Sequence, residues 1–173
     1  MMKRFILPLI TVFCFYGESL FVEFLPSFSF LDNRIMVPRF LLVVLVMMGI
    51  YYFRNVTLIY AAIFGLLFDI YYTGVIGVYL FLFPIAVYAA SKMMKVLQIN
   101  VLALGLAVLV IVALTEALVY GLNILLFDVK MTAGQFLYNR LIPTLILNLI
   151  FYLIIFFPLS RWLQNRKKEL LSE

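Results

Sequence analysis

The feature that most constrains this chain is an almost unbroken apolar sequence from Phe5 to Trp162. Hydrophobic residues make up 67% of its 173 residues and charged residues 12%. A soluble domain of this size would leave too much apolar surface in contact with water, so we predict an integral membrane protein. Charges within apolar stretches are costly and usually face protein or water instead of lipid. Here they are Glu18, Glu23, Asp69, Glu116 and Arg140.

The composition also limits the chemistry that is available. The net charge of +5 comes from basic residues at the ends of apolar segments, which is typical of topology determinants and not of a nucleic-acid-binding surface. There is no histidine, the commonest general base and transition-metal ligand. The single Cys14 excludes an intramolecular disulfide, and no activated Ser or Cys arrangement or phosphate-binding loop is present. We therefore expect no enzyme activity, no metal and no cofactor.

The first residues, Met1 to Arg4, followed by an apolar stretch, imitate a signal peptide. The apolar stretch is long for that role, contains Glu18 and Glu23, and lacks a small-x-small cleavage site. We interpret it as a retained first transmembrane span.

The apolar sequence divides into six predicted spans of a single transmembrane domain, residues 1–173. The stretch 56–90 carries only the charge of Asp69 and, as one helix, would be on the order of 50 Å long against a hydrocarbon core of about 30 Å. It must fold back, and the glycines and tyrosines of Asp69–Gly77 suit the turn, which leaves a short third span. The predicted spans are about 5–25, 38–53, 56–68, 75–90, 99–127 and 136–160. This predicts an all-α polytopic membrane bundle.

The basic residues orient these spans. With both termini inside, nine basic residues face the cytoplasm and four face outward, a clear positive-inside bias. A five-span arrangement would leave the cluster Arg166-Lys167-Lys168 outside, so it is disfavoured. The inner set is Lys3, Arg4, Arg54, Lys92, Lys95, Arg161, Arg166, Lys167 and Lys168, and the outer set is Arg34, Arg39, Lys130 and Arg140.

On this topology the embedded charges gather in one outer layer. We predict two neutralising pairs in it, because a partner recovers much of the cost of a buried charge. Glu116 is expected to pair with Arg140, and Glu18 or Glu23 with Arg39.

Polar side chains also form two stripes at helical spacing. The simplest interpretation is that they hydrogen-bond between helices. A polar cavity open to the outside, or a docking surface for another membrane protein, remain as alternatives. The stripes are Glu116, Tyr120 and Asn123 in the fifth span, and Thr144, Asn148 and Tyr152 in the sixth.

The motif Gly65-Leu-Leu-Phe-Asp69, followed by Gly74 and Gly77, resembles the MreD family of bacterial rod-shape proteins. In that family a glycine, an Asp four residues later and a further glycine form the hairpin between the third and fourth spans. The length, the basic N-terminus, the second span begun by Pro38 and the basic stub after the last span match it too. For Asp69 two roles stay open: a helix cap, or a contact with a partner. Ala61 and Gly65 form a small-xxx-small pair expected to let the third helix pack closely.

The resemblance implies a non-enzymatic, multi-pass scaffold in the bacterial cell membrane. MreD-like proteins act with MreC, a single-span protein with an extracellular domain, and with MreB filaments. Together they support RodA and a class B penicillin-binding protein in side-wall peptidoglycan synthesis. A homodimer is a further expectation. The family is similar in fold to the substrate-binding subunits of energy-coupling-factor transporters, which are six-helix bundles with an outward-facing pocket.

That similarity leaves a second hypothesis, a subunit that binds a small, vitamin-type solute for transport. Such a subunit docks on its energising module through small residues, for example Ala-x-x-x-Ala on an early helix. The first span carries bulky Phe13, Phe15 and Tyr16 instead, which favours the scaffold.

Overall fold

The computed structural model describes residues 6–24, 34–97, 99–127 and 131–172, and every regular element in these ranges is helical. Two five-residue π-helical segments, η3 and η4, extend neighbouring α-helices. Phe5 and Leu25, the predicted ends of the first span, and the basic residues Lys3, Arg4 and Lys130 lie outside the described residues. The elements are α1 (Ile6–Phe24), α2 (Phe40–Tyr51), α3 (Arg54–Phe68), η3 (Asp69–Thr73), α4 (Val78–Val96), α5 (Val101–Phe127), α6 (Ala133–Phe136), η4 (Leu137–Leu141) and α7 (Ile142–Ser172).

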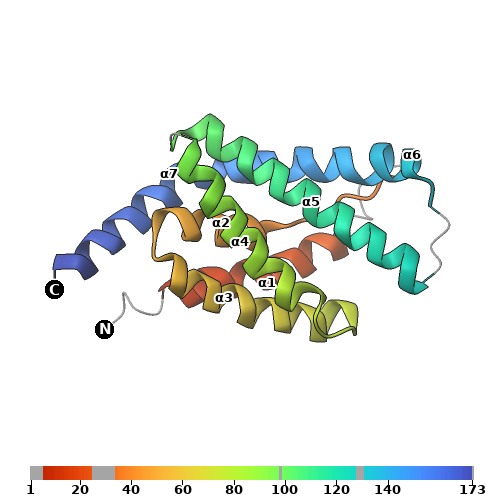
Figure 1. Ribbon diagram of the computed structural model, residues 1–173, viewed down its shortest axis with the longest axis horizontal. Helices are drawn as coiled ribbons and strands as arrows, with labels where there is room; N and C mark the ends of the chain where they lie inside the picture. Colours follow the sequence, from red (N-terminus) through yellow and green to blue (C-terminus); the bar gives the residue numbers. More distant parts are fainter. Residues whose placement is uncertain (1–5, 25–33, 98, 128–130, 173) are drawn as a thin grey trace.

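Within the described ranges, five helical stretches are long and apolar enough to cross a membrane, so the predicted helical membrane bundle is confirmed. Successive long helices run in opposite directions along the molecule (Figure 1). The start of α1 and the end of α7 lie at the same end of the bundle (Figure 1).

The short helix of the bundle is α2, which lies in the predicted second span. Its 12 residues extend for about 18 Å, less than a hydrocarbon core of about 30 Å. Its side chains are apolar on all sides, and ten of the 12 residues are buried. A helix that is hydrophobic all round belongs in the centre of a bundle, and α2 packs against α1, α3, α4, α5 and α7.

The irregular segment 34–39 continues α2 toward the start of α7 (Figure 1). Six residues outside a helix can add up to about 20 Å, so the segment and α2 together have the reach to cross the bilayer. Only part of the predicted span 38–53 is therefore helical. Residues 38 and 39 of that predicted span are non-helical backbone.

The third helix is longer than the predicted span 56–68. It begins at Arg54 and continues through η3 to Thr73, 20 residues in all. The prediction ended it before Asp69 because the turn was expected to extend over Asp69–Gly77, with its glycines and tyrosines. In the structure Asp69 is fully buried and bonded to α4, so the helix continues past it.

The turn between η3 and α4 is made by Gly74 and Gly77. Their φ angles are 66° and 114°, in the left-handed region that favours glycine. The glycines predicted for the bend are therefore the residues that make it.

The last helix does not end near Leu159, as the predicted span 136–160 required. It continues to Ser172 with Pro158 inside it, and its C-terminal part turns away from its first part (Figure 1). Proline removes one helical hydrogen bond and kinks the helix without necessarily ending it. The predicted basic stub is thus helical, and Leu163 and Arg166 on it are buried.

Candidate functional site

The embedded charges meet at Glu116 of α5. Its Oε1 accepts a hydrogen bond from Arg39 Nε at 2.7 Å, and its Oε2 accepts one from Arg140 Nε at 2.9 Å. Side-chain exposure is 0% for Glu116, 3% for Arg39 and 21% for Arg140. The predicted pair of Glu116 with Arg140 is confirmed. One carboxylate thereby joins the residue before α2, the helix α5 and the segment η4.

The prediction that Arg39 pairs with Glu18 or Glu23 is wrong, because its carboxylate partner is Glu116. The guanidinium also donates to the hydroxyl of Tyr79 at 2.8 Å and lies 5.0 Å from the centre of that ring. Tyr79 is buried at the start of α4. Tyr79 was not among the predicted site residues, because nothing in the sequence separates it from the other tyrosines.

Glu18 instead accepts a hydrogen bond from the backbone at the start of α2. Its Oε1 accepts a hydrogen bond from the N–H of Leu41 at 2.8 Å, and a carboxylate is favoured at a helix N-terminus. Its Oε2 is buried and has no hydrogen-bond partner among the described residues.

Glu18 also lines a cavity of about 400 Å³ between α1, η3 and α4. The cavity is bordered by Glu23, Arg39, Tyr72 and Tyr79 as well. Glu23 is exposed, unlike Glu18. The cavity therefore borders Glu18 and Arg39, whereas Glu116 and Arg140 do not line it.

Asn148 and Thr144 of α7 form hydrogen bonds with the backbone of the irregular segment 34–39. Thr144 Oγ1 accepts from the N–H of Val37 at 3.1 Å, and Asn148 Oδ1 accepts from the N–H of Arg39 at 2.8 Å. Asn148 Nδ2 donates to the carbonyl of Val37 at 3.0 Å. Non-helical backbone at membrane depth needs such partners because lipid offers none. The stripe was predicted to hydrogen-bond between helices, and among the described residues only Tyr152 does so, donating to the carbonyl of Val101 in α5 at 2.8 Å. Thr144 and Asn148 bond instead to non-helical backbone.

A further bond of the same kind comes from the π-helical segment η4. The carbonyl of Asn139 in η4 accepts from the N–H of Ile35 at 2.7 Å. Segment 34–39 is thus held along η4 and α7.

Asp69 acts as a cap for α4. Its carboxylate accepts hydrogen bonds from the N–H groups of Gly77 and Tyr79, each at 2.8 Å, and of Leu80 at 3.1 Å. These donors belong to the first turn of α4, which has no other partners for them within a helix. Of the two roles left open for Asp69, the structure shows the cap.

Gly65 lets α3 and α4 approach each other. A Cβ at this position would lie 2.7 Å from the backbone carbonyl carbon of Tyr79, and nearer still to its oxygen. Ala61, one turn earlier, is fully buried. The predicted close packing by this small pair is confirmed.

Tyr120 and Asn123 take no part in the charge cluster. Tyr120 stacks on Phe136 with ring centres 4.2 Å apart, and its hydroxyl donates to the carbonyl of Met131 at 2.6 Å. Asn123 lines a separate cavity of about 220 Å³ between η3, α4 and α5. The face predicted from spacing is therefore divided between two environments. No group of three Cys, Asp or Glu side chains suited to a metal occurs in the described part of the chain.

Comparison with known proteins shows the family to which the chain belongs. The family model for the rod shape-determining protein MreD matches residues 3–166. The chain is 39% identical to the rod shape-determining protein MreD of Bacillus subtilis, over 99% of this chain and the full length of that protein. No solved structure matches it significantly. In this chain the Gly-Asp-Gly-Gly motif builds the α3–α4 hairpin, and the family model matches nearly the whole length. The chain therefore belongs to the MreD family of rod shape-determining proteins.

Proposed function

We propose that this protein is a non-enzymatic scaffold in the bacterial plasma membrane that binds the transmembrane helix of an MreC-like partner. Through that partner it would help to position the peptidoglycan synthases of side-wall growth, RodA and a class B penicillin-binding protein, in concert with MreB. One observation carries the proposal. The embedded charged residues are used mainly to hold the bundle together, as Glu116 and Asp69 show, so the chemistry left for function lies on the apolar faces.

The proposed topology has six crossings with both termini in the cytoplasm. The crossing of α2 is completed by segment 34–39, whose backbone is hydrogen-bonded to α7 and η4. An even number of crossings agrees with the start of α1 and the end of α7 lying at the same end (Figure 1). The positive-inside bias assigns that end to the cytoplasm.

The face we propose for the partner is a groove of about 430 Å³ between α1 and α7. Both helices pack against α2, and Val44 of α2 lines the groove. Its other lining residues are apolar or weakly polar, and Phe13, at 77% exposure, stands at its side. A groove of this composition, running along helices long enough to span, suits a single apolar helix and not a soluble domain. The lining residues are Ile6, Ile10, Phe13, Cys14, Val44, Phe151, Ile155, Pro158, Leu159 and Trp162.

The test is co-purification in mild detergent of the tagged chain with the MreC-like protein of the same genome. A form of that partner whose membrane helix is replaced by an unrelated one serves as the control. Recovery that depends on the native helix supports the scaffold. Equal recovery of both forms would place recognition outside the bilayer and contradict the proposed groove.

A matched pair of variants on α7 locates the contact. Ile155→Trp fills the groove, whereas Ile146→Trp adds the same ring on an exposed position outside it. We expect Ile155→Trp to reduce recovery of the partner and Ile146→Trp to leave it unchanged. If a second copy of this chain occupies the groove, Ile155→Trp will instead change the oligomeric state.

The second candidate function is a substrate-binding subunit of a small-solute transporter, with the fold of energy-coupling-factor subunits. The cavity of about 400 Å³ favours it, together with Glu18 Oε2, which has no hydrogen-bond partner within the described ranges. They offer a buried acceptor to a cationic solute. A small molecule or an ATPase module that co-purifies with the chain, in place of the MreC-like protein, would support this function. Glu18→Gln should then abolish retention of the small molecule.

A further inference from the structure

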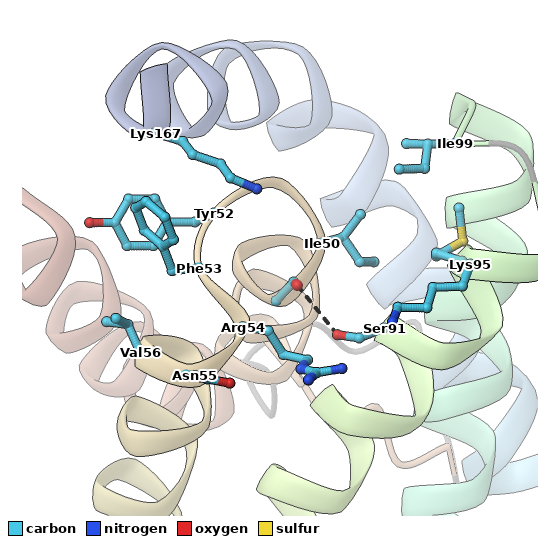
Figure 2. Close-up of a pocket in the computed structure, with 12 residues that line it drawn as sticks. Ile50, Tyr52, Phe53, Arg54, Asn55, Val56, Ser91, Lys95, Ile99 and Lys167 are labelled. Carbon is cyan, nitrogen blue, oxygen red and sulfur yellow. Dashed lines mark hydrogen bonds between the residues drawn. The ribbon is translucent and has the colours of Figure 1, made fainter. Parts of the chain in front are cut away.

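A second polar cavity lies away from the charge cluster, at the end of the bundle where α2 joins α3. It has a volume of about 520 Å³ and is lined from α2, α3, α4 and α7. Arg54 begins α3 and Lys95 lies in the last turn of α4, so this end of the bundle is at the membrane–water interface. Figure 2 shows Arg54, Lys95 and Lys167 extending toward this space from three different helices.

The lining of this cavity carries three positive charges and no carboxylate. The sequence explains the imbalance, because residues 34–115, which include α2, α3 and α4, contain no Asp or Glu apart from Asp69 at the opposite end of α3. Arg54 lies over the ring of Tyr88 at 5.7 Å and Lys167 over the ring of Phe53 at 5.6 Å. These contacts orient both cations without neutralising them.

The start of α3 adds to the positive potential. Arg54, Asn55 and Val56 line the cavity, and they form the first turn of the helix, whose N–H groups have no partner within it. Phe53, the residue before the helix, provides no side-chain cap. Backbone N–H groups and the helix dipole favour an anion at such a position.

The remaining lining residues indicate what kind of anion fits. Ser91 lines the cavity, but its hydroxyl donates to the carbonyls of Val87 at 2.8 Å and Gly49 at 3.3 Å, so its proton is already used. Ile50, Met94 and Ile99 form apolar walls. A site with cations at an interface and apolar walls beside them matches a molecule with a charged head and a hydrocarbon tail.

We propose that this cavity binds the phosphate headgroup of an anionic phospholipid. Arg54, Lys95 and Lys167 hold the phosphate, the first turn of α3 donates to it, and the acyl chains leave past Ile99 into the bilayer. The position of the cavity at the interface follows from the helix ends, while the leaflet rests on the proposed topology. Lipid binding here ties the joint between α2 and α3 to α4 and α7.

The test uses the purified full chain in detergent, titrated with dioctanoyl-phosphatidylglycerol and followed by native mass spectrometry. The cavity variant is Arg54→Gln with Lys95→Gln and Lys167→Gln. The matched control, Lys92→Gln with Arg161→Gln and Lys168→Gln, removes the same charge at the same end from residues outside the lining. Since each basic residue next to an anionic lipid contributes roughly a fivefold gain in binding, we expect the cavity variant to bind at least about tenfold more weakly. The control should bind as the wild type does.

Other probes separate the sources of the anion. Dioctanoyl-phosphatidylcholine should bind more weakly than phosphatidylglycerol, and inorganic phosphate or hexaglutamate should not displace the lipid at equal concentration. If both triple variants bind phosphatidylglycerol equally weakly, the proposal is overturned and binding depends only on non-specific charge attraction. Displacement by phosphate or by hexaglutamate would overturn it in favour of a soluble anion or an acidic protein segment.

Two single variants provide a second test in case the triple cavity variant does not fold. Lys95 is exposed and Lys167 is half-buried, so Lys95→Gln and Lys167→Gln should each leave the bundle intact. Each should weaken phosphatidylglycerol binding relative to Lys92→Gln. Binding unchanged in both would overturn the assignment. The measurement needs no partner protein, so its outcome is independent of MreC binding.

Discussion

Glu116 shows how a single carboxylate can make three charges tolerable inside a membrane bundle. It is fully buried and pairs with Arg39 through Oε1 and with Arg140 through Oε2. Buried ion pairs add little net stability compared with apolar residues, but removing one partner leaves the other charge unpaired. Loss of Glu116 should therefore destabilise the bundle severely.

Glu116→Gln should lower the free energy of unfolding by about 3–5 kcal/mol, because two arginines then face each other without a counter-charge. Adding Arg140→Gln should cost less than the sum of the two single changes. Denaturant unfolding in mixed micelles measures both quantities. Additive losses would show that the two side chains do not interact.

Gly65→Ala should destabilise the protein by about 1–3 kcal/mol, because the new methyl group meets the backbone of Tyr79, which has no freedom to move aside. Gly17→Ala is the matched control, since it also lies in a helix but has open space around it. The control should be neutral or stabilising by up to about 1 kcal/mol. Thermal unfolding of the two variants side by side makes the comparison, and equal effects would contradict the close approach of α3 and α4.

At the scale of elements, two parts of the bundle depend on polar side chains supplied by a neighbour. The α3–α4 hairpin depends on Asp69, and segment 34–39 depends on Asn148 and Thr144. In both cases a buried side chain satisfies backbone groups that would otherwise meet hydrocarbon. The helices are thus joined by hydrogen bonds from side chain to backbone where packing alone would leave donors unpaired.

Asp69→Ala should reduce the yield of folded protein, because three N–H groups at the start of α4 lose their acceptor. Loss of a helix cap costs about 0.5–2 kcal/mol, and each buried donor left unpaired adds about 1–3 kcal/mol. Asp69→Asn retains one acceptor oxygen, so its yield of folded protein should lie between those of the wild type and Asp69→Ala. Folded yield by size-exclusion chromatography ranks the three. Full yield of Asp69→Ala with weakened partner binding would move Asp69 from the hairpin to the partner surface.

Asn148→Leu should free segment 34–39, because the N–H of Arg39 and the carbonyl of Val37 lose their side-chain partner. We expect faster hydrogen exchange at Arg39 and its neighbours, measured by mass spectrometry of peptides covering the segment. Asn123→Leu on α5 is the control, since Asn123 lines a different cavity. Equal exchange in both variants would show that segment 34–39 is held by other contacts.

At the scale of the whole molecule, the proposed topology predicts which residues a reagent can reach from outside the cell. In a Cys14→Ala background, Gly134→Cys before η4 should react with a membrane-impermeant maleimide in intact cells. Ser172→Cys, at the end of α7, should react only after the cells are opened. Both positions are exposed, so accessibility reports the side of the membrane and not burial. Labelling of Ser172→Cys in intact cells would place the end of α7 outside and contradict the proposed topology.

The sequence by itself determined that this is a helical membrane protein, placed the α3–α4 hairpin at its glycines and paired Glu116 with Arg140. Those features depend on composition, on backbone conformations that only glycine adopts readily, and on the cost of a lone charge in hydrocarbon. Tertiary structure alone decided that Arg39 also binds Glu116, that Glu18 serves the start of α2, and that α3 continues past Asp69. Each of these depends on which buried backbone or side-chain group a neighbouring helix brings within hydrogen-bonding distance. Spacing along one helix fixes the face on which a side chain lies, but not the partner that it meets there.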